Sequence, residues 1–100
     1  MPKKYFAVRL LSRRPTFPAD ITPEERVIMK QHAAYWIGFM NQGKVLTFGP
    51  VLDPKGAYGL GILAVDSEEE IPAILDNDPA TSLTTYEYYP MMAITPTSNS

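Results

Sequence analysis

The sequence predicts an α+β fold of the ferredoxin-like type, βαββαβ, from three observations on its 100 residues. Four segments of strand length and two helical segments follow one another in this order. Each helical segment begins with a candidate capping box, and the third strand segment is apolar on both of its faces. The expected architecture is a four-stranded antiparallel sheet with two helices on one face.

The first expected strand covers residues 5–11, in which apolar side chains alternate with a second set that contains Arg9. A long loop with prolines follows at residues 12–20. Loops of this length often form a rim or flap over a site, and a surface excursion with Phe17 against the core explains the loop equally well. Both interpretations stay open.

The first helix is expected over residues 23–42. Thr22 and Glu25 have the spacing of a capping box, and Pro23 suits the first helical position. Gly43 suits the end of the helix because glycine tolerates the left-handed conformation.

One stripe of this helix is largely aromatic and contains the only histidine of the chain. Spacings of three, four and seven place on this stripe Ile28, His32, Tyr35, Trp36 and Phe39. Histidine is the residue type whose side chain ordinarily titrates near neutral pH, so His32 is the first candidate for proton chemistry. A core histidine that a buried acid or a carbonyl satisfies would occupy the same position.

The later segments complete the expected order, with strands at 44–52, 57–65 and 84–94 and a second helix that begins within 66–70 and closes at 77–79. Ser67 and Glu70 form a second possible capping box, and the successive glutamates suit the positive end of a helix dipole better than a metal site. We expect one domain over residues 1–95 and a flexible tail at 96–100.

The third strand predicts how the sheet is covered. Gly59 and Gly61 lie on one of its faces, where another backbone, a helix or a ligand can approach closely. Both faces are apolar or glycine, which indicates that both are buried. Two helices cover one face only, so we expect a homodimer in which sheet packs against sheet.

The composition excludes several classes of function. A net charge of −2 gives no reason to expect nucleic acid or an anionic membrane as a partner. Cysteine is absent, which removes disulfides, thiolate catalysis and cysteine-ligated zinc. No apolar run approaches the length of a membrane span. We therefore expect a cytoplasmic protein that uses no cofactor and binds no metal.

Several motifs together resemble the YciI-like (YCII-related) family. In chain order they are Tyr5-Phe6-Ala7-Val8, Gln31-His32 with Tyr35, Gly43-Lys44-Val45, Gly49-Pro50-Val51-Leu52-Asp53, Asp66-Ser67-Glu68-Glu69 and Asp78-Pro79. The resemblance covers nearly the whole chain. It implies a dimeric α+β barrel with a site centred on a histidine and an aspartate, and it implies an enzyme of small molecules whose reaction is open. The wider fold superfamily includes isomerases and monooxygenases.

The resemblance assigns the histidine to His32 and leaves two aspartates as its partner. Asp53 follows the second strand and Asp78 follows the second helix. Both positions fall toward the end of the sheet where the first helix finishes, and we place Asp53 slightly ahead of Asp78.

A histidine paired with a carboxylate can take a proton and return it. We expect Tyr35, Trp36 and Phe39 to bind a small, flat, mostly apolar substrate beside this pair. Arg9 either binds an anionic group of the substrate or, by our preference, pairs with an acid across the dimer. Proton transfer, isomerisation and elimination fit this equipment. The alternative is a non-catalytic homodimeric module that binds a ligand or serves as an accessory protein.

Overall fold

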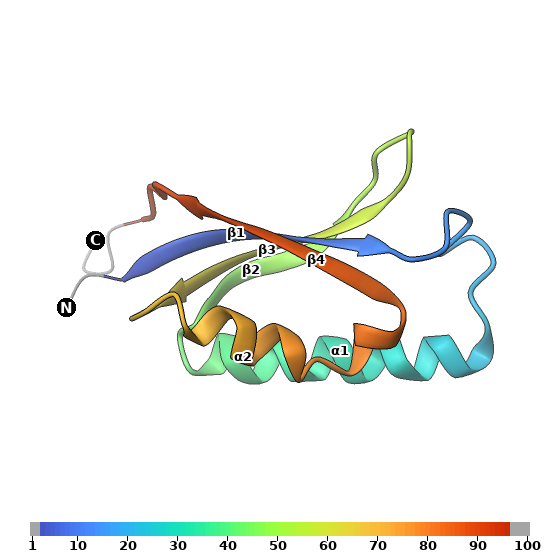
Figure 1. Cartoon of the computed structure of the whole chain (residues 1–100), viewed down its shortest axis with the longest axis horizontal. Coiled ribbons are helices and arrows are strands. Elements are labelled where there is room, and N and C mark those ends of the chain that lie inside the picture. The colour runs from blue at the N-terminus through green and yellow to red at the C-terminus, as the bar shows by residue number, and fades with distance from the viewer. Residues whose placement is uncertain (1–2, 97–100) are drawn as a thin grey trace.

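A computed structural model describes residues 3–96, and the predicted fold is confirmed (Figure 1). The elements are β1 (Lys4–Ser12), α1 (Pro23–Asn41), β2 (Val45–Val51), β3 (Tyr58–Val65), α2 (Glu70–Asp76), the 3-10 helix η1 (Pro79–Ser82) and β4 (Thr84–Met91). The sheet has the strand order β2-β3-β1-β4, and every neighbouring pair is antiparallel. Both α-helices lie on the same side of the sheet (Figure 1).

The start of α1 follows its capping box. The hydroxyl of Thr22 accepts a hydrogen bond from the Glu25 amide at 3.1 Å, and the Glu25 carboxylate accepts one from the Thr22 amide at 2.9 Å. At the other end, Gly43 has a φ of 79°, the left-handed conformation expected there. No helix in the described chain is long and apolar enough to cross a membrane.

The second helix begins at Glu70, the last residue of the predicted range, and its capping box forms only in half. The Glu70 carboxylate accepts from the backbone amide of Ser67 at 3.1 Å. The Ser67 hydroxyl, however, donates to the Glu69 carboxylate, and the start of the helix has no side-chain cap. The helix starts at Glu70, and Pro72 falls within its first turn, where a missing amide donor does little harm.

The segment after α2 contains an element that the sequence did not predict. Pro79 begins the short helix η1, and Asp78 caps it by accepting the Ala80 amide at 2.9 Å. The last strand ends at Met91, three residues earlier than expected. The expected tail falls partly on residues 97–100, which lie outside the described residues, so the boundary of the domain stays a prediction.

The core lies between the sheet and the helices. Its buried members are Phe6, Val8, Leu10, Trp36, Val45, Leu63, Val65, Ile71, Ile74 and Leu75. The close approach expected at Gly61 is made by α1, because the Trp36 ring lies directly over this glycine. Gly59 is similarly approached by the Leu10 side chain.

Replacing Gly61 by alanine is expected to lower the free energy of unfolding by about 1–3 kcal/mol, the range for an overpacked core. A Cβ at this position would lie 3.0 Å from Trp36 Cη2 and closer still to Cζ3, so the ring would have to move. Urea unfolding measures the effect. Gly38→Ala is the matched control: nothing lies within 4 Å of a Cβ there, and alanine should stabilise α1 by about 0.5–1 kcal/mol. Equal stability of wild type and Gly61→Ala would contradict the packing.

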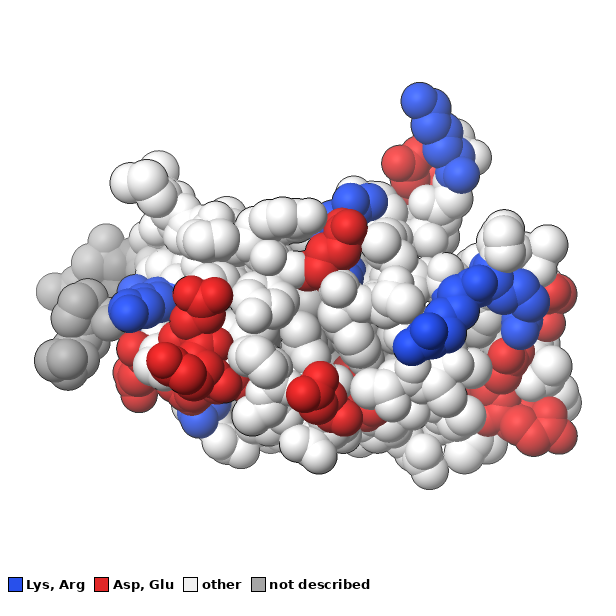
Figure 2. Space-filling model, in the orientation of Figure 1, with Lys and Arg blue, Asp and Glu red and all other residues white. Residues whose placement is uncertain are grey.

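The face of the sheet opposite the helices is largely apolar. Within the strands of the described chain, the register places two charged side chains on this face, Arg9 and Glu87, and they pair at 3.0 Å. Figure 2 shows most charged side chains near the two ends of the molecule. Near mid-length it shows one opposite-charge pair and, on the helix side, an acidic group. Tyr89 and Met91, on this open face, are 55% and 40% exposed.

Candidate active site

A buried histidine–aspartate pair lies between α1 and the segment that joins α2 to η1. His32 Nδ1 is 2.9 Å from Asp78 Oδ1 and 2.8 Å from Oδ2. The Asp78 side chain is fully buried and the His32 side chain is 10% exposed. The two residues are 46 positions apart, so the fold brings them together.

The contact with Asp78 determines which ring nitrogen of His32 is free. A carboxylate only accepts hydrogen bonds, so Nδ1 must carry the proton that points to Asp78. In the neutral ring, Nε2 then has an unprotonated lone pair. This nitrogen is the one that can accept a proton from a bound molecule.

Asp78 is held by two further donors. Trp36 Nε1 donates to Oδ2 at 2.6 Å, and the Ala80 amide donates to Oδ1 at 2.9 Å. Burial alone would raise the pKa of the Asp78 carboxyl, but the hydrogen bonds from His32, Ala80 and Trp36 outweigh it and hold this pKa below its ordinary value. Asp78 is therefore a fixed anion that orients the imidazole ring.

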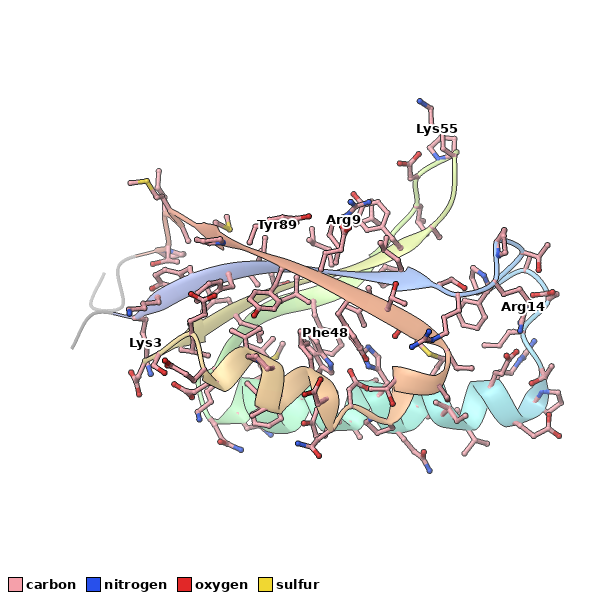
Figure 3. All side chains as sticks on the ribbon, viewed as in Figure 1. Lys3, Arg9, Arg14, Phe48, Lys55 and Tyr89 are labelled. Carbon is pink, nitrogen blue, oxygen red and sulfur yellow. The ribbon has the colours of Figure 1, made fainter. Side chains whose placement is uncertain are left out.

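A cavity of about 270 Å³ opens beside His32, between the sheet and α1. Its lining is Leu10, Ser12, Phe17, Pro18, Met29, His32, Ala33, Trp36, Phe48, Gly49, Pro50, Ala57, Tyr58, Gly59, Leu60 and Thr84. Two of these lining residues have titratable side chains, His32 and Tyr58. Phe48 lies in the space between the sheet and α1 (Figure 3), and its ring meets the His32 ring edge-on at 6.4 Å.

The structure joins Asp78, and not Asp53, to His32. Asp53 is exposed in the β2–β3 hairpin, where its carboxylate accepts the Lys55 amide at 2.9 Å. This hairpin projects away from the helices, as the position of Lys55 in Figure 3 shows. The slight preference for Asp53 is corrected by this placement, and we drop Asp53 from the candidate site.

Arg9 lies on the open face of the sheet and does not line the cavity (Figure 3). Its guanidinium pairs with Glu87 of the neighbouring strand at 3.0 Å and lies 4.7 Å from the centre of the Tyr58 ring. The acid that was expected across a dimer is thus supplied by the same chain. A role of Arg9 in substrate binding stays a prediction, and the cavity beside His32 is lined without it.

The aromatic residues of α1 divide between two surroundings. Trp36 lines the cavity, whereas Tyr35 and Phe39 pack together at 5.0 Å outside it. The Tyr35 hydroxyl donates to the Ile74 carbonyl at 2.8 Å, and burial together with the Asp78 charge raises its pKa. Of the three aromatic residues expected to bind substrate, the geometry keeps Trp36.

The face of α1 that lines the cavity carries two residues missed in the sequence, Met29 and Ala33. With His32 and Trp36 they fall at helical spacings of three, four and seven, so the same periodicity contains them. The expected stripe included Tyr35 and Phe39, which lie on a neighbouring face of the helix, and therefore left out Met29 and Ala33. Phe17 and Phe48 also line the cavity, so the long loop supplies part of the cavity wall.

Candidate metal ligands are dispersed in the described chain. Within residues 3–96, no three His, Cys, Asp or Glu side chains come together as possible ligands. His32 and Asp78 bind each other, and the rest of the cavity offers mostly carbon atoms.

Comparison with known proteins identifies the family. One similar solved structure is a point variant of SnoaB, a cofactor-independent oxygenase from Streptomyces nogalater. It aligns over 98% of this chain and 99% of the SnoaB chain with a TM-score of 0.50 and 16% identity, which supports the shared fold. Among curated proteins, no sequence match was found. The sequence model of the YCII-related domain matches residues 6–95, which confirms the resemblance found in the sequence, and the chain therefore belongs to the YCII-related domain family.

Proposed function

We propose that this protein is a small-molecule enzyme in which His32 moves a proton through Nε2 while Asp78 holds the ring. The observation that carries this proposal is the buried His32–Asp78 pair at the wall of an apolar cavity. A core histidine needs only a partner, and here the ring has both a partner and a cavity beside it. Such an arrangement is typical of general acid–base catalysis.

The proposed chemistry is one proton transfer followed by one of two outcomes. His32 Nε2 takes a proton from carbon or oxygen of the substrate, and the imidazolium that forms is stabilised by the Asp78 carboxylate. Return of the proton at another atom completes an isomerisation, and departure of a leaving group completes an elimination. SnoaB is described as a cofactor-independent oxygenase, so chemistry without a cofactor is compatible with this fold.

The cavity supports a small and mostly apolar substrate. Its volume of about 270 Å³ lies near the lower end of ligand sites. Trp36 and Phe48, whose ring centres are 5.6 Å apart, offer flat surfaces beside His32. A planar ring compound with one acidic hydrogen fits this lining best.

Deuterium exchange tests the proposal directly. The wild-type protein is incubated in D2O with neutral lactones, cyclic 1,3-diketones and hydroxylated aromatic compounds, and proton NMR follows the loss of individual hydrogens. The proposal expects catalysed exchange or conversion of a compound that also raises the melting temperature. Compounds that bind in the cavity without exchange would favour the alternative, a non-catalytic ligand-binding or accessory module.

We also propose that the protein forms a homodimer through the open face of the sheet. Around the Arg9–Glu87 pair this face is mostly apolar, and its polar pair is already satisfied within one chain. An apolar sheet face of this kind is stabilised by a second layer. A second copy supplies a surface of the same composition, which is the usual solution in symmetric dimers.

Tyr89→Glu is expected to weaken this dimer, raising its dissociation constant at least about tenfold. Tyr89 lies on the open face opposite Ala7 of β1, and a carboxylate there would be buried without a partner. Analytical ultracentrifugation measures the change. Ile37→Glu, on the outer side of α1 at a residue 46% exposed, is the control and should leave the dimer intact. A wild-type protein that sediments as a monomer would contradict the proposal.

A further inference from the structure

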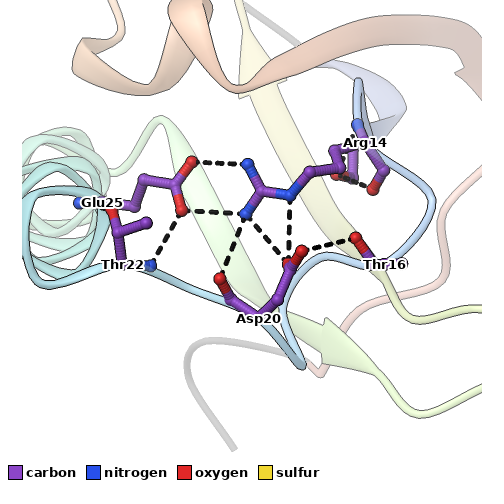
Figure 4. Close-up of polar contacts among 6 residues, drawn as sticks. Arg14, Thr16, Asp20, Thr22 and Glu25 are labelled. Atoms are coloured by element: carbon purple, nitrogen blue, oxygen red, sulfur yellow. Dashed lines mark hydrogen bonds and ion pairs between the residues drawn. The ribbon is translucent and has the colours of Figure 1, made fainter.

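The loop between β1 and α1 is tied down by one arginine. Arg14 makes a bidentate ion pair with Glu25, with Nη1–Oε2 at 2.8 Å and Nη2–Oε1 at 2.9 Å. Its Nε donates to Asp20 Oδ1 at 3.0 Å (Figure 4). Because the three residues stand at the start of the loop, at its end and in the first turn of α1, the arginine closes the loop onto the helix.

The anchor of this cluster on α1 is firm. The Glu25 side chain is only 12% exposed and also completes the capping box with Thr22. Hydrogen bonds from Arg14 and from the Thr22 amide lower the pKa of Glu25 to about 2, so it stays ionised. Asp20 is fixed from its other side by the Thr16 hydroxyl at 2.6 Å (Figure 4). Bidentate pairs such as Arg14–Glu25 are among the stronger charge-assisted contacts.

The same loop supplies part of the cavity wall. Phe17 and Pro18 line the cavity together with His32. The Arg14 guanidinium lies 5.6 Å from the centre of the Phe17 ring, so it contacts the wall as well as the anchors. Arg14, Asp20 and Glu25 are themselves outside the lining of the cavity.

We propose that Arg14 is a positioning residue that holds Phe17 and Pro18 as one wall of the His32 cavity and thereby sets its affinity for apolar ligands. The inference rests on the proposed function only in requiring that the cavity receives a ligand. It does not require that His32 transfers a proton. A charge cluster outside the cavity thus controls the binding of an uncharged molecule inside it.

The test measures binding of 2-naphthol, a flat, neutral and fluorescent probe. Arg14→Gln is expected to weaken this binding about tenfold, because the wall loses its fixed position. Phe17→Ala should weaken binding as well, and the double variant should be little worse than either single variant, since both changes remove one wall. Arg26→Gln is the matched control, because it removes the same charge from an exposed position next to Glu25.

The salt dependence of probe affinity distinguishes a positioning role of Arg14 from a role in stability alone. From about 0.05 to about 1 M NaCl, screening should weaken the Arg14 cluster and lower the affinity of wild type for the neutral probe relative to Arg14→Gln. Should Arg14→Gln fail to fold, Phe17→Ala serves as the reference for the salt comparison, because it already lacks the ring that Arg14 contacts. Unchanged affinity in Arg14→Gln, parallel salt curves, or a wild type that does not bind 2-naphthol would overturn the proposal. The two proposals can fail separately. If His32→Gln reacts as fast as wild type while Arg14→Gln binds 2-naphthol more weakly, the proposed catalysis is wrong and the proposed role of Arg14 is supported.

Discussion

Replacing His32 by glutamine is expected to slow proton transfer by about 10²–10⁴-fold, the range for loss of a general acid–base group. Glutamine retains an N–H donor for Asp78 but has no nitrogen that can take a proton at neutral pH. The rate of deuterium exchange of a compound that wild type turns over measures the loss. Binding of that compound should change far less, because the cavity walls remain.

The control for His32→Gln lies one residue away. Gln31 is exposed on the same helix, so Gln31→Ala should keep the full exchange rate. Circular dichroism establishes that both variants are folded. Exchange at the wild-type rate in a folded His32→Gln protein would show that His32 is a packed core residue, and the non-catalytic alternative would then stand.

Replacing Asp78 by alanine is expected to lower the free energy of unfolding by at least about 3 kcal/mol, since each buried donor left without an acceptor costs about 1–3 kcal/mol. The carboxylate accepts from His32 Nδ1, Trp36 Nε1 and the Ala80 amide, and alanine leaves all three donors buried without an acceptor. Urea unfolding followed by the fluorescence of Trp36, the only tryptophan, measures the change.

Asparagine at position 78 separates shape from charge. Asp78→Asn keeps the volume and one carbonyl oxygen, so a smaller loss of stability is expected than for alanine. A loss below about 1 kcal/mol in Asp78→Ala would be no more than an ordinary hydrogen bond contributes and would contradict the three-donor geometry.

The pH dependence of stability gives a second readout for Asp78. Its pKa is lower in the folded chain than in the unfolded chain, so the ionised group stabilises the fold above the unfolded pKa of about 3.9. That contribution is lost as the pH falls through the folded pKa. The wild-type stability should therefore decline in acid below about pH 4 more steeply than the stability of Asp78→Asn.

The parts of this fold that could be predicted are those that short stretches of sequence determine. The capping box of Thr22 and Glu25 lies within four residues, and the left-handed Gly43 ends the same helix. Alternation along β1 likewise identified its buried face, where Phe6 is 3% exposed. In each case the residues that decide the structure are neighbours in the chain.

The candidate site escaped prediction where it depends on distant segments. Asp53 and Asp78 each follow a secondary-structure element near the same end of the sheet, and nothing local distinguishes them as partners of His32. Asp78 is selected because it caps η1, which places its side chain in the interior beside His32. A 3-10 helix of four residues has little sequence signal. The pairing of Arg9 with Glu87 depends similarly on the register between β1 and β4, which the sequence does not state.

The position of Asp78 has a consequence for how new specificities could arise on this scaffold. One carboxylate caps η1 and also orients the His32 ring, so the His32 end of the cavity is built into the folded frame. Phe17 and Pro18, by contrast, belong to a loop that is fastened from outside by Arg14. Directed evolution for a different ligand can therefore change the lining that this loop supplies while the His32–Asp78 pair keeps its place in the frame.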